Sequence, residues 1–278
     1  MSWSAPPREL ADGKLLIDEP ADGVVRLTIS NPAKRNALDH PILDAITATL
    51  VELSGVGGLS SPARCVLVTG AHGMFSAGYD IGEIPEDEFE ERAERLVAHP
   101  FTQAIDALEA FPHPTLAALP GHTIGGGLEL ALSCDLRVAQ AGIKLGMPPA
   151  KLGLVYSHTG LRRFIDAIGA ARTRELFLLG SYIDAPTALA WGLVNRVAGA
   201  EELEALALEL AGELAANAPL SQRGNKRVIA ALLHAESELA ADVEAELIEL
   251  RRASFASRDL REGMRAFAER RAPLWRGE

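Results

Sequence analysis

In the first half of the chain, short apolar runs typical of buried strands alternate with stretches in which apolar residues recur at helical spacing. Residues 24–29 and 64–69 are short, rich in β-branched residues and bounded by turn residues, which predicts two strands. Between them, Asp39 and Pro41 open a stretch in which apolar residues recur at helical spacing, which predicts a helix. A third short apolar run, residues 115–119, follows a Pro-His-Pro breaker and predicts another buried strand.

The middle of the chain continues this alternation. Short strands are expected over residues 136–139 and 143–145, and an apolar helix over 128–133. A helix rich in charges is expected over about 86–111, with Pro100 as a candidate break. Three further helices are expected to start at about Gly160, Ala170 and Pro186, the last with Asp184 as its N-cap.

From Glu201 onward, alanine, leucine and glutamate dominate the sequence. Apolar residues such as Leu203 and Leu206 begin a stripe that lies on one face of a helix. Strands therefore alternate with helices up to about residue 198, and the remainder is expected to be helical. The predicted fold is an α/β core over residues 1–198 with a helical subdomain over 199–278.

Composition narrows the classes of function. The chain of 278 residues has 27 lysines and arginines against 38 aspartates and glutamates, a net charge of −11. This balance argues against nucleic-acid or anionic-membrane binding, and neither a signal peptide nor a membrane span is expected. Cys65 and Cys134 lie in apolar contexts and are expected to be buried thiols, so no disulfide or metal site is predicted. We expect a soluble, cytoplasmic protein.

Two glycine-rich passages, residues 70–81 and 121–129, each follow a predicted strand. Neither contains a P-loop, a dinucleotide fingerprint or a nucleophile elbow, so Ser76 is not expected to be a nucleophile. Glycines at a helix start expose unpaired N–H groups to a ligand oxygen. With a second donor from the loop 77–79, they would form an oxyanion hole. Close helix–strand packing explains the same glycines equally well at this point.

Four segments resemble the crotonase (enoyl-CoA hydratase/isomerase) superfamily. Residues 75–81 and 125–135 are similar to its paired signatures, residues 31–38 to its N-terminal coenzyme A segment, and residues 261–271 to its C-terminal helix. The resemblance spans roughly residues 20–275, with the four motifs in the family's order.

This resemblance implies a spiral of ββα turns with a C-terminal helical domain, assembled as a homotrimer or a dimer of trimers. It also implies an acyl-CoA thioester substrate, whose coenzyme A is part of the substrate rather than a separate cofactor. The oxyanion donors would be the N–H groups of Tyr79 and Gly126. The coenzyme A-binding residues would be Ala33, Lys34, Arg35, Ala77, Asp80 and Ile81.

Glu129 matches the first of the two catalytic glutamates of the hydratases, but the second is absent. Its position is taken by Pro149, and residues 146–150 contain no carboxylate. Because hydration in that family uses both carboxylates, ordinary hydratase or isomerase chemistry is in doubt. Residues 149–156 and 75–85 resemble instead the methylmalonyl-CoA decarboxylase-like branch.

In that branch a tyrosine at the position of Tyr156 faces the substrate, whereas Tyr79 stands where the branch typically has histidine. A phenol does not carry protons at neutral pH as imidazole does, and the nearby His158 is a candidate replacement. The favoured function is decarboxylation of a substituted malonyl-CoA. The alternatives are a hydratase, isomerase or lyase with Glu129 as its sole carboxylate, and a non-catalytic acyl-CoA-binding scaffold.

Overall fold

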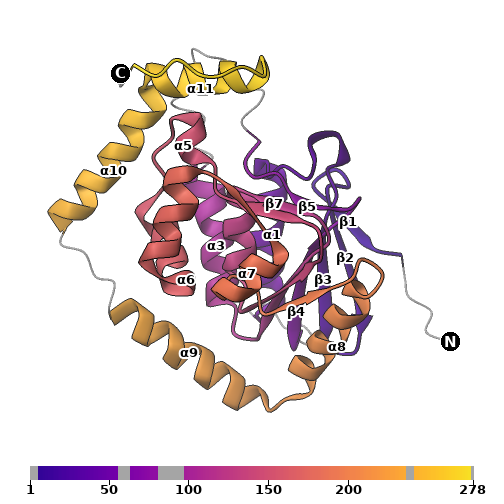
Figure 1. Cartoon of the computed structure of the whole chain (residues 1–278). Coiled ribbons are helices and arrows are strands. Elements are labelled where there is room, and N and C mark those ends of the chain that lie inside the picture. Colours follow the sequence, from indigo (N-terminus) through magenta and orange to yellow (C-terminus); the bar gives the residue numbers. More distant parts are fainter. Residues whose placement is uncertain (1–5, 56–62, 81–96, 236–240, 277–278) are drawn as a thin grey trace.

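The computed structural model describes residues 6–55, 63–80, 97–235 and 241–276, and two sheets form its centre (Figure 1). The larger sheet has the order β1-β2-β3-β4-β6-β8-β11 and is parallel from β3 to β11. Its strands are β1 (Arg8–Leu10), β2 (Leu15–Ala21), β3 (Val24–Ile29), β4 (Cys65–Gly70), β6 (Thr115–Leu119), β8 (Leu136–Gln140) and β11 (Arg196–Ala198).

The smaller sheet has the order β10-β9-β7-β5, in which β5, β7 and β9 follow β4, β6 and β8 in sequence and β10 adds an edge strand. Each turn of the chain thus gives one strand to each sheet before a helix returns it, which is a spiral of ββα turns. The predicted α/β class with this spiral is confirmed. The strands are β5 (Met74–Ser76), β7 (His122–Ile124), β9 (Lys144–Gly146) and β10 (Tyr182–Asp184).

Helices begin where the sequence supplies their caps. The Asp39 carboxylate accepts a hydrogen bond from the Ile42 N–H at 3.0 Å, and Asp184 caps the helix that starts at Ala185, as predicted. The helices are α1 (His40–Leu53), α3 (Thr102–Ala110), α4 (Gly126–Leu132), α5 (Pro149–Leu152), α6 (His158–Leu179), α7 (Ala185–Trp191), α8 (Leu203–Ala216), α9 (Pro219–Ala235), α10 (Ala241–Ala256) and α11 (Arg258–Ala268).

Both faces of the parallel strands are covered, which explains their nearly continuous apolar sequences. Val66 and Val68 of β4 pack toward α1 and α3, whereas Cys65 and Leu67 pack against α8 on the opposite face. Burial raises the pKa of the Cys65 thiol to about 12, in agreement with the expected inert thiol. Helix α8 lies beyond residue 198 and yet covers the core sheet, and the division of the chain at that residue stays a prediction.

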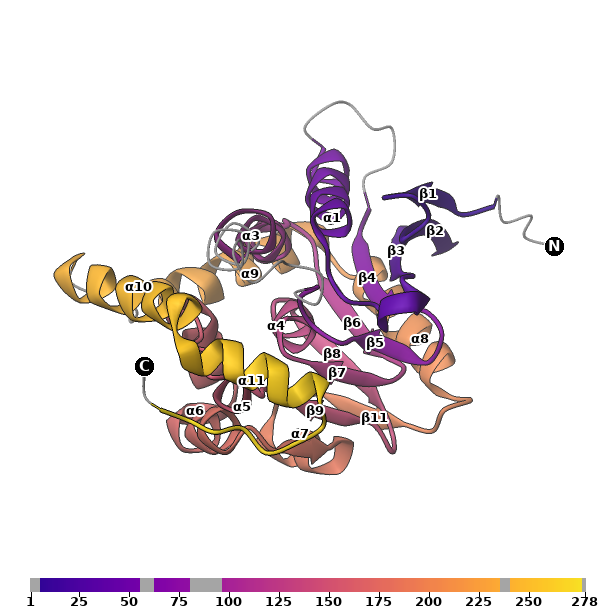
Figure 2. The same ribbon diagram turned by 90° about the horizontal axis from the view of Figure 1, so that it is seen from above.

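Helices α9 to α11 lie at the periphery of the fold (Figure 2). Helix α11 packs on α5 and α10, beside the end of the smaller sheet, whereas α9 exposes several large apolar side chains. Within the described residues, no helix is both long and apolar enough to cross a membrane.

Some elements differ from the sequence prediction. The strands β1, β5, β7, β10 and β11, of three residues each, were not predicted because they carry too little apolar pattern. Strand β2 was not predicted because Asp18, Glu19 and Pro20 interrupt its apolar run. The two helices expected near Gly160 and Ala170 agree with the structure, since α6 consists of two helical segments that meet at a non-helical Gly169 (φ 77°). The expected charged helix is described only from residue 97, as a π-helical turn Val97–Phe101 that contains Pro100 and leads into α3.

Candidate active site

Two backbone N–H groups lie close to the start of α4, one on the helix itself and one on the loop after β5. Gly126 is the first residue of this helix, so its N–H has no acceptor inside the helix. Tyr79 forms a parallel bridge with Leu38, in which the Gly78 carbonyl and the Asp80 N–H face Leu38. The Tyr79 N–H therefore faces the opposite side, and within the described residues neither amide donates a hydrogen bond.

Glycines allow these two segments to approach closely. A Cβ on Gly78 would lie 3.0 Å from the Ile124 carbonyl oxygen and 3.3 Å from the Gly126 nitrogen. Gly78 has φ +99° and Gly125 has φ +56°, conformations that L side chains rarely adopt. Close packing and exposed donors thus occur together here. The contact brings the loop after β5 against the start of α4, as an oxyanion hole requires.

The Tyr79 ring covers Gly126. A Cβ on Gly126 would lie 2.6 Å from Tyr79 Cε1, so no larger residue fits without moving the ring. The ring also packs edge-on against Phe101, with centroids 4.6 Å apart. Its hydroxyl lies 3.3 Å from the Tyr156 hydroxyl. The phenol that takes the place of a histidine is therefore joined to the second predicted tyrosine.

Glu129 lies in the first turn of α4 and is 2% exposed. The Tyr156 hydroxyl donates a hydrogen bond to Glu129 Oε2, and Arg163 Nη1 lies 3.3 Å from Glu129 Oε1. Gly160 of α6 makes room for both partners, because its Cβ would lie 2.8 Å from Glu129 Oε1 and 2.6 Å from Tyr156 Cε1. The structure thus brings Tyr79, Tyr156 and Glu129 into one hydrogen-bonded row.

Burial dominates the electrostatics of this row. It raises the pKa of Glu129, while the charge of Arg163 and the Tyr156 hydrogen bond oppose the shift. Burial and the neighbouring Glu129 charge also raise the pKa of both Tyr79 and Tyr156 well above the ordinary value. At neutral pH the phenols are therefore neutral, and Glu129 is the group of the row whose proton affinity the site can tune.

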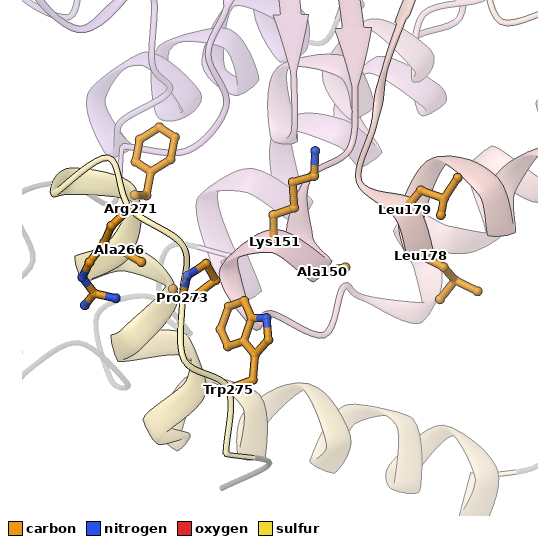
Figure 3. A pocket seen from close by; sticks show the side chains of 10 residues that line it. Ala150, Lys151, Leu178, Leu179, Ala266, Arg271, Pro273 and Trp275 are labelled. Atoms are coloured by element: carbon orange, nitrogen blue, oxygen red, sulfur yellow. The ribbon is translucent and has the colours of Figure 1, made fainter.

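A cavity of about 10 Å³ adjoins the row, which is about the room that one water molecule needs. It is lined by Tyr79, Leu154, Val155, Tyr156, Ser157, Arg251 and Phe255. A larger hollow of about 320 Å³ lies between α5, the end of α6 and the C-terminal segment (Figure 3). Its lining includes Leu178, Leu179 and Trp275 but no carboxylate, so we place the chemistry at the smaller cavity.

The predicted coenzyme A-binding residues gather along the segment that precedes Leu38. Lys34 Nζ lies 2.7 Å from Asp80 Oδ2, and the Ala77 N–H donates to the Arg35 carbonyl at 3.1 Å. Ala33 and Arg35 are exposed, while Lys34 and Asp80 are partly buried. Ile81 lies outside the described residues. Asn36, which the sequence reading did not single out, joins this segment to the loop before β5 by donating to the Ala71 and Met74 carbonyls.

Two other predicted positions lie apart from the row. Pro149 begins the short helix α5 and is buried. His158 begins α6, where its Nε2 lies 3.5 Å from a carboxylate oxygen of Glu244 on α10. The imidazole thus faces a surface helix, and no contact joins it to Tyr79.

Arg163 and Glu109 are the functional candidates that the sequence reading missed. Arg163 Nε lies 2.6 Å from Glu109 Oε1, although the two residues are 54 positions apart. No motif marks either residue. The available signal was the place of Arg163 on α6, about one turn after Gly160 and seven residues after Tyr156, and this does not identify a partner.

Comparisons with known proteins agree with this architecture. Residues 19–278 match the family described as enoyl-CoA hydratase/isomerase. The enoyl-CoA isomerase/hydratase of Mycosarcoma maydis is 34% identical over 263 residues, which cover 92% of this chain and 93% of that protein.

Solved structures are similar over nearly the whole length. Methylmalonyl-CoA decarboxylase complexed with 2S-carboxypropyl-CoA is 29% identical and gives a TM-score of 0.85 over 95% of this chain and 98% of the other. An enoyl-CoA hydratase of Mycobacterium avium subsp. paratuberculosis is 26% identical and gives a TM-score of 0.78 over 95% and 98%.

Proposed function

Because the chain belongs to the enoyl-CoA hydratase/isomerase family, we propose that it binds an acyl-CoA thioester and stabilises the enolate formed from it. The N–H groups of Tyr79 and Gly126 donate to the thioester oxygen as its negative charge grows. Their lack of other acceptors among the described residues supports this assignment. Each such donor is worth about 2.7–4 kcal/mol of transition-state stabilisation.

The coenzyme A part of the substrate lies along residues 33–35 and the loop that follows β5. The exposed Arg35 meets a phosphate, because a guanidinium suits phosphate geometry. Lys34 is oriented by its ion pair with Asp80, while Ala33 and Ala77 present small side chains beside the pantetheine arm. Ile81 is assigned to the same arm by the motif alone. No cofactor or metal ion separate from the substrate is part of this proposal.

The reaction we propose is decarboxylation of a substituted malonyl-CoA. The observation that carries it is the isolation of Glu129: Pro149 occupies the second glutamate position, and Glu129 shares its hydrogen bonds with a tyrosine and an arginine. Loss of CO₂ needs no base, because the electrons of the breaking C–C bond enter the thioester carbonyl and form the enolate. The similarity to solved methylmalonyl-CoA decarboxylase structures supports the same choice.

The enolate carbon must then receive a proton. Tyr156 gives its hydroxyl proton to the carbon, and a protonated Glu129 returns one to the phenolate oxygen through the hydrogen bond that joins them. Solvent restores the Glu129 proton, so one proton is consumed for each CO₂ released. The raised pKa of both groups supports this order, since neither a lasting phenolate nor a charged Glu129 is favoured in a dry site.

Hydration, isomerisation or another lyase reaction with Glu129 as its sole carboxylate is the second candidate. The enoyl-CoA isomerase/hydratase name of the Mycosarcoma maydis relative favours it. In that case an ionised Glu129 positions the water or removes the proton. A non-catalytic acyl-CoA-binding scaffold is the remaining candidate.

Incubation of the purified protein with methylmalonyl-, ethylmalonyl- and crotonyl-CoA separates these candidates. We expect CO₂ release from a malonyl thioester and no change in the absorbance of crotonyl-CoA. Rapid hydration of crotonyl-CoA without CO₂ release would replace decarboxylation by the second candidate. A scaffold would turn over none of the three, and Glu129→Gln and Tyr156→Phe would then leave acyl-CoA binding unchanged.

We also propose that the chain assembles as a homotrimer or a dimer of trimers. Helix α9 exposes Leu220, Val228, Ile229 and Leu232, each more than half exposed, which is costly for a chain in isolation. Light scattering of the purified protein should give three or six times the chain mass of 29.6 kDa. A monomer at micromolar concentration would contradict the assembly and leave the enolate chemistry untouched.

A further inference from the structure

A cluster of charges lies directly behind Glu129. Arg163 of α6 holds Glu109 of α3 with two parallel hydrogen bonds, Nε to Oε1 at 2.6 Å and Nη2 to Oε2 at 2.9 Å. Its Nη2 also lies 3.6 Å from Asp106 Oδ1. The remaining nitrogen, Nη1, lies 3.3 Å from Glu129 Oε1. The Arg163 side chain is 17% exposed and that of Glu129 is 3% exposed, so solvent screens this contact weakly.

Arg163 divides one positive charge among three carboxylates. The bidentate bond to Glu109 is the geometry in which guanidinium–carboxylate pairs are strongest, and it draws the cation away from Glu129. The contact of Arg163 with Glu129 is longer, so Glu129 interacts more weakly with this positive charge than Glu109 does. Burial lowers the pKa of Arg163, but the bonds to Glu109 and the nearby carboxylates outweigh this effect and raise it, so the cation is permanent.

The charge of Glu129 decides how the hydroxyl row is directed. When Glu129 is ionised, Tyr156 donates to it and Tyr79 can donate to Tyr156. When Glu129 is protonated, it donates to Tyr156, and the Tyr156 hydroxyl proton is free to point away from α4. Only the second arrangement offers a proton toward a bound acyl group.

We infer that Arg163, clamped by Glu109, is a positioning residue that sets whether Glu129 carries a proton and thereby the direction of the Tyr79–Tyr156 hydroxyl row. The inference rests on the proposed function for its catalytic meaning, but the charge relationship stands on the contacts alone. Neither Arg163 nor Glu109 touches the reacting atoms.

The groups around Glu129 come from three elements. Arg163 faces it from α6, Tyr156 from the loop before α6, and Glu109 from α3. Arg163 lowers the pKa of Glu129, whereas Glu109 raises it, both by its own charge and by holding the guanidinium away. Removal of Arg163 and removal of Glu109 should therefore move the proton affinity of Glu129 in opposite directions.

Difference infrared titration of the full-length protein tests this directly. The band of a protonated carboxylic acid that disappears in Glu129→Gln reports the Glu129 proton. In Arg163→Gln, the midpoint of that band should move up by about one pH unit or more, a tenfold rise in proton affinity. In Glu109→Gln, it should move down. Equal midpoints in the wild type and both variants would overturn the inference.

Two further variants guard against a merely structural effect. Arg163→Lys keeps the charge but loses the paired hydrogen bonds to Glu109, so its midpoint should lie closer to that of the wild type than to that of Arg163→Gln. Arg162→Gln is the matched control, because the Arg162 side chain is paired with Asp166 one turn further along α6. A shift in Arg162→Gln as large as that in Arg163→Gln would also refute the inference.

The pH profile of kcat/KM keeps this inference separate from the proposed function. Decarboxylation that uses protonated Glu129 falls as pH rises through the Glu129 pKa, whereas hydration that uses ionised Glu129 rises. Arg163→Gln should move either limb to higher pH. If kcat/KM rises with pH and this limb moves in Arg163→Gln, only the decarboxylation proposal is refuted. If the limb lies at the same pH in the wild type and in Arg163→Gln, only the role of Arg163 is refuted.

Discussion

An arginine that is at least partly buried lies at each end of helix α4, but the partners of the two cations differ. At the C-terminal end, the Arg137 guanidinium donates to the Leu193, Leu132 and Cys134 carbonyls at 2.7, 3.2 and 2.6 Å. At the N-terminal end, Arg163 is bonded to the carboxylates of Glu109 and Glu129. The helix dipole favours a cation at the first of these places and an anion at the second.

Backbone carbonyls cannot take up a proton at neutral pH, whereas carboxylates can. The Arg137 contacts therefore do not change when a carboxylate gains or loses a proton, and their effect is to fix the turn between α4 and β8. The Arg163 contacts change whenever Glu129 gains or loses its proton. Arg137 is thus a structural element at one end of α4, whereas the contacts of Arg163 at the other end change with the protonation of Glu129.

The largest effect is expected from Arg137→Met, which keeps the volume but leaves three carbonyls without their charged donor. We expect a loss of about 4.5 kcal/mol or more in the free energy of unfolding, because each of the three hydrogen bonds from this charged donor is worth about 1.5–3 kcal/mol. Denaturant unfolding measures the loss. The pH profile of the folded enzyme should not move, in contrast to that of Arg163→Gln.

Arg137→Lys tests whether the charge or the geometry matters at this end. A lysine ammonium lacks the planar fork of N–H donors that lets the guanidinium reach three separate carbonyls. Arg137→Lys should therefore recover only part of the lost free energy of unfolding. If Arg137→Met moved the pH profile and Arg163→Gln did not, the contrast between the two ends would be wrong.

Gly126→Ala should have the next largest effect, and on activity rather than on stability. The new Cβ would lie 2.6 Å from Tyr79 Cε1, so the ring must move or the start of α4 must shift away from the loop that carries the Tyr79 amide. Loss of one oxyanion donor would lower kcat by about 10²–10³-fold. Steady-state kinetics on the substrate identified by CO₂ release provides the measurement.

Gly212→Ala is the matched control, because a Cβ at that position in α8 meets no atom within 4 Å. It should leave kcat unchanged and raise stability by up to about 1 kcal/mol, since alanine is the better helix former. Full activity in Gly126→Ala would show that the N-terminal end of α4 is packed for stability, as its C-terminal end is.

Tyr156→Phe removes the hydroxyl that joins Tyr79 to Glu129. We expect a fall in kcat of about 10²-fold, near the lower limit for the loss of a general acid, because water can partly replace the hydroxyl. Tyr182→Phe is the control: this exposed tyrosine on β10 contacts Lys151, outside the hydroxyl row. If Tyr182→Phe lowered kcat as much as Tyr156→Phe, the fall could not be assigned to the row.

The fold was largely predictable because its determinants are local. Short stretches of consecutive residues were enough to predict the strands 24–29 and 115–119 and the caps Asp39 and Asp184, and the structure confirms them. The crotonase resemblance is confirmed by the family match and by the solved structures. The position of α8 on the core sheet was not predictable, because its alanine-rich face fits any flat apolar surface.

The site was predictable only as far as motifs reach. Tyr79, Gly126, Glu129 and Tyr156 lie in recognisable segments, and the structure brings them together. Their roles stay predictions until they are measured. The clamp of Arg163 by Glu109 depends on how α3 and α6 pack, which no local pattern encodes.

The smallest effect is expected from Ser133→Ala, at the end of α4 opposite to the amides. The Ser133 hydroxyl donates to the Glu129 carbonyl at 2.9 Å, but the same carbonyl also accepts the Ser133 N–H at 3.0 Å. It therefore stays satisfied when the hydroxyl is lost, and the free energy of unfolding should fall by about 1 kcal/mol or less. Glu129 shares only its backbone with this contact, so neither kcat nor the infrared midpoint of its carboxylate should change. A shift of that midpoint would mean that the position of α4 along its axis, rather than Arg163 alone, sets the charge of Glu129.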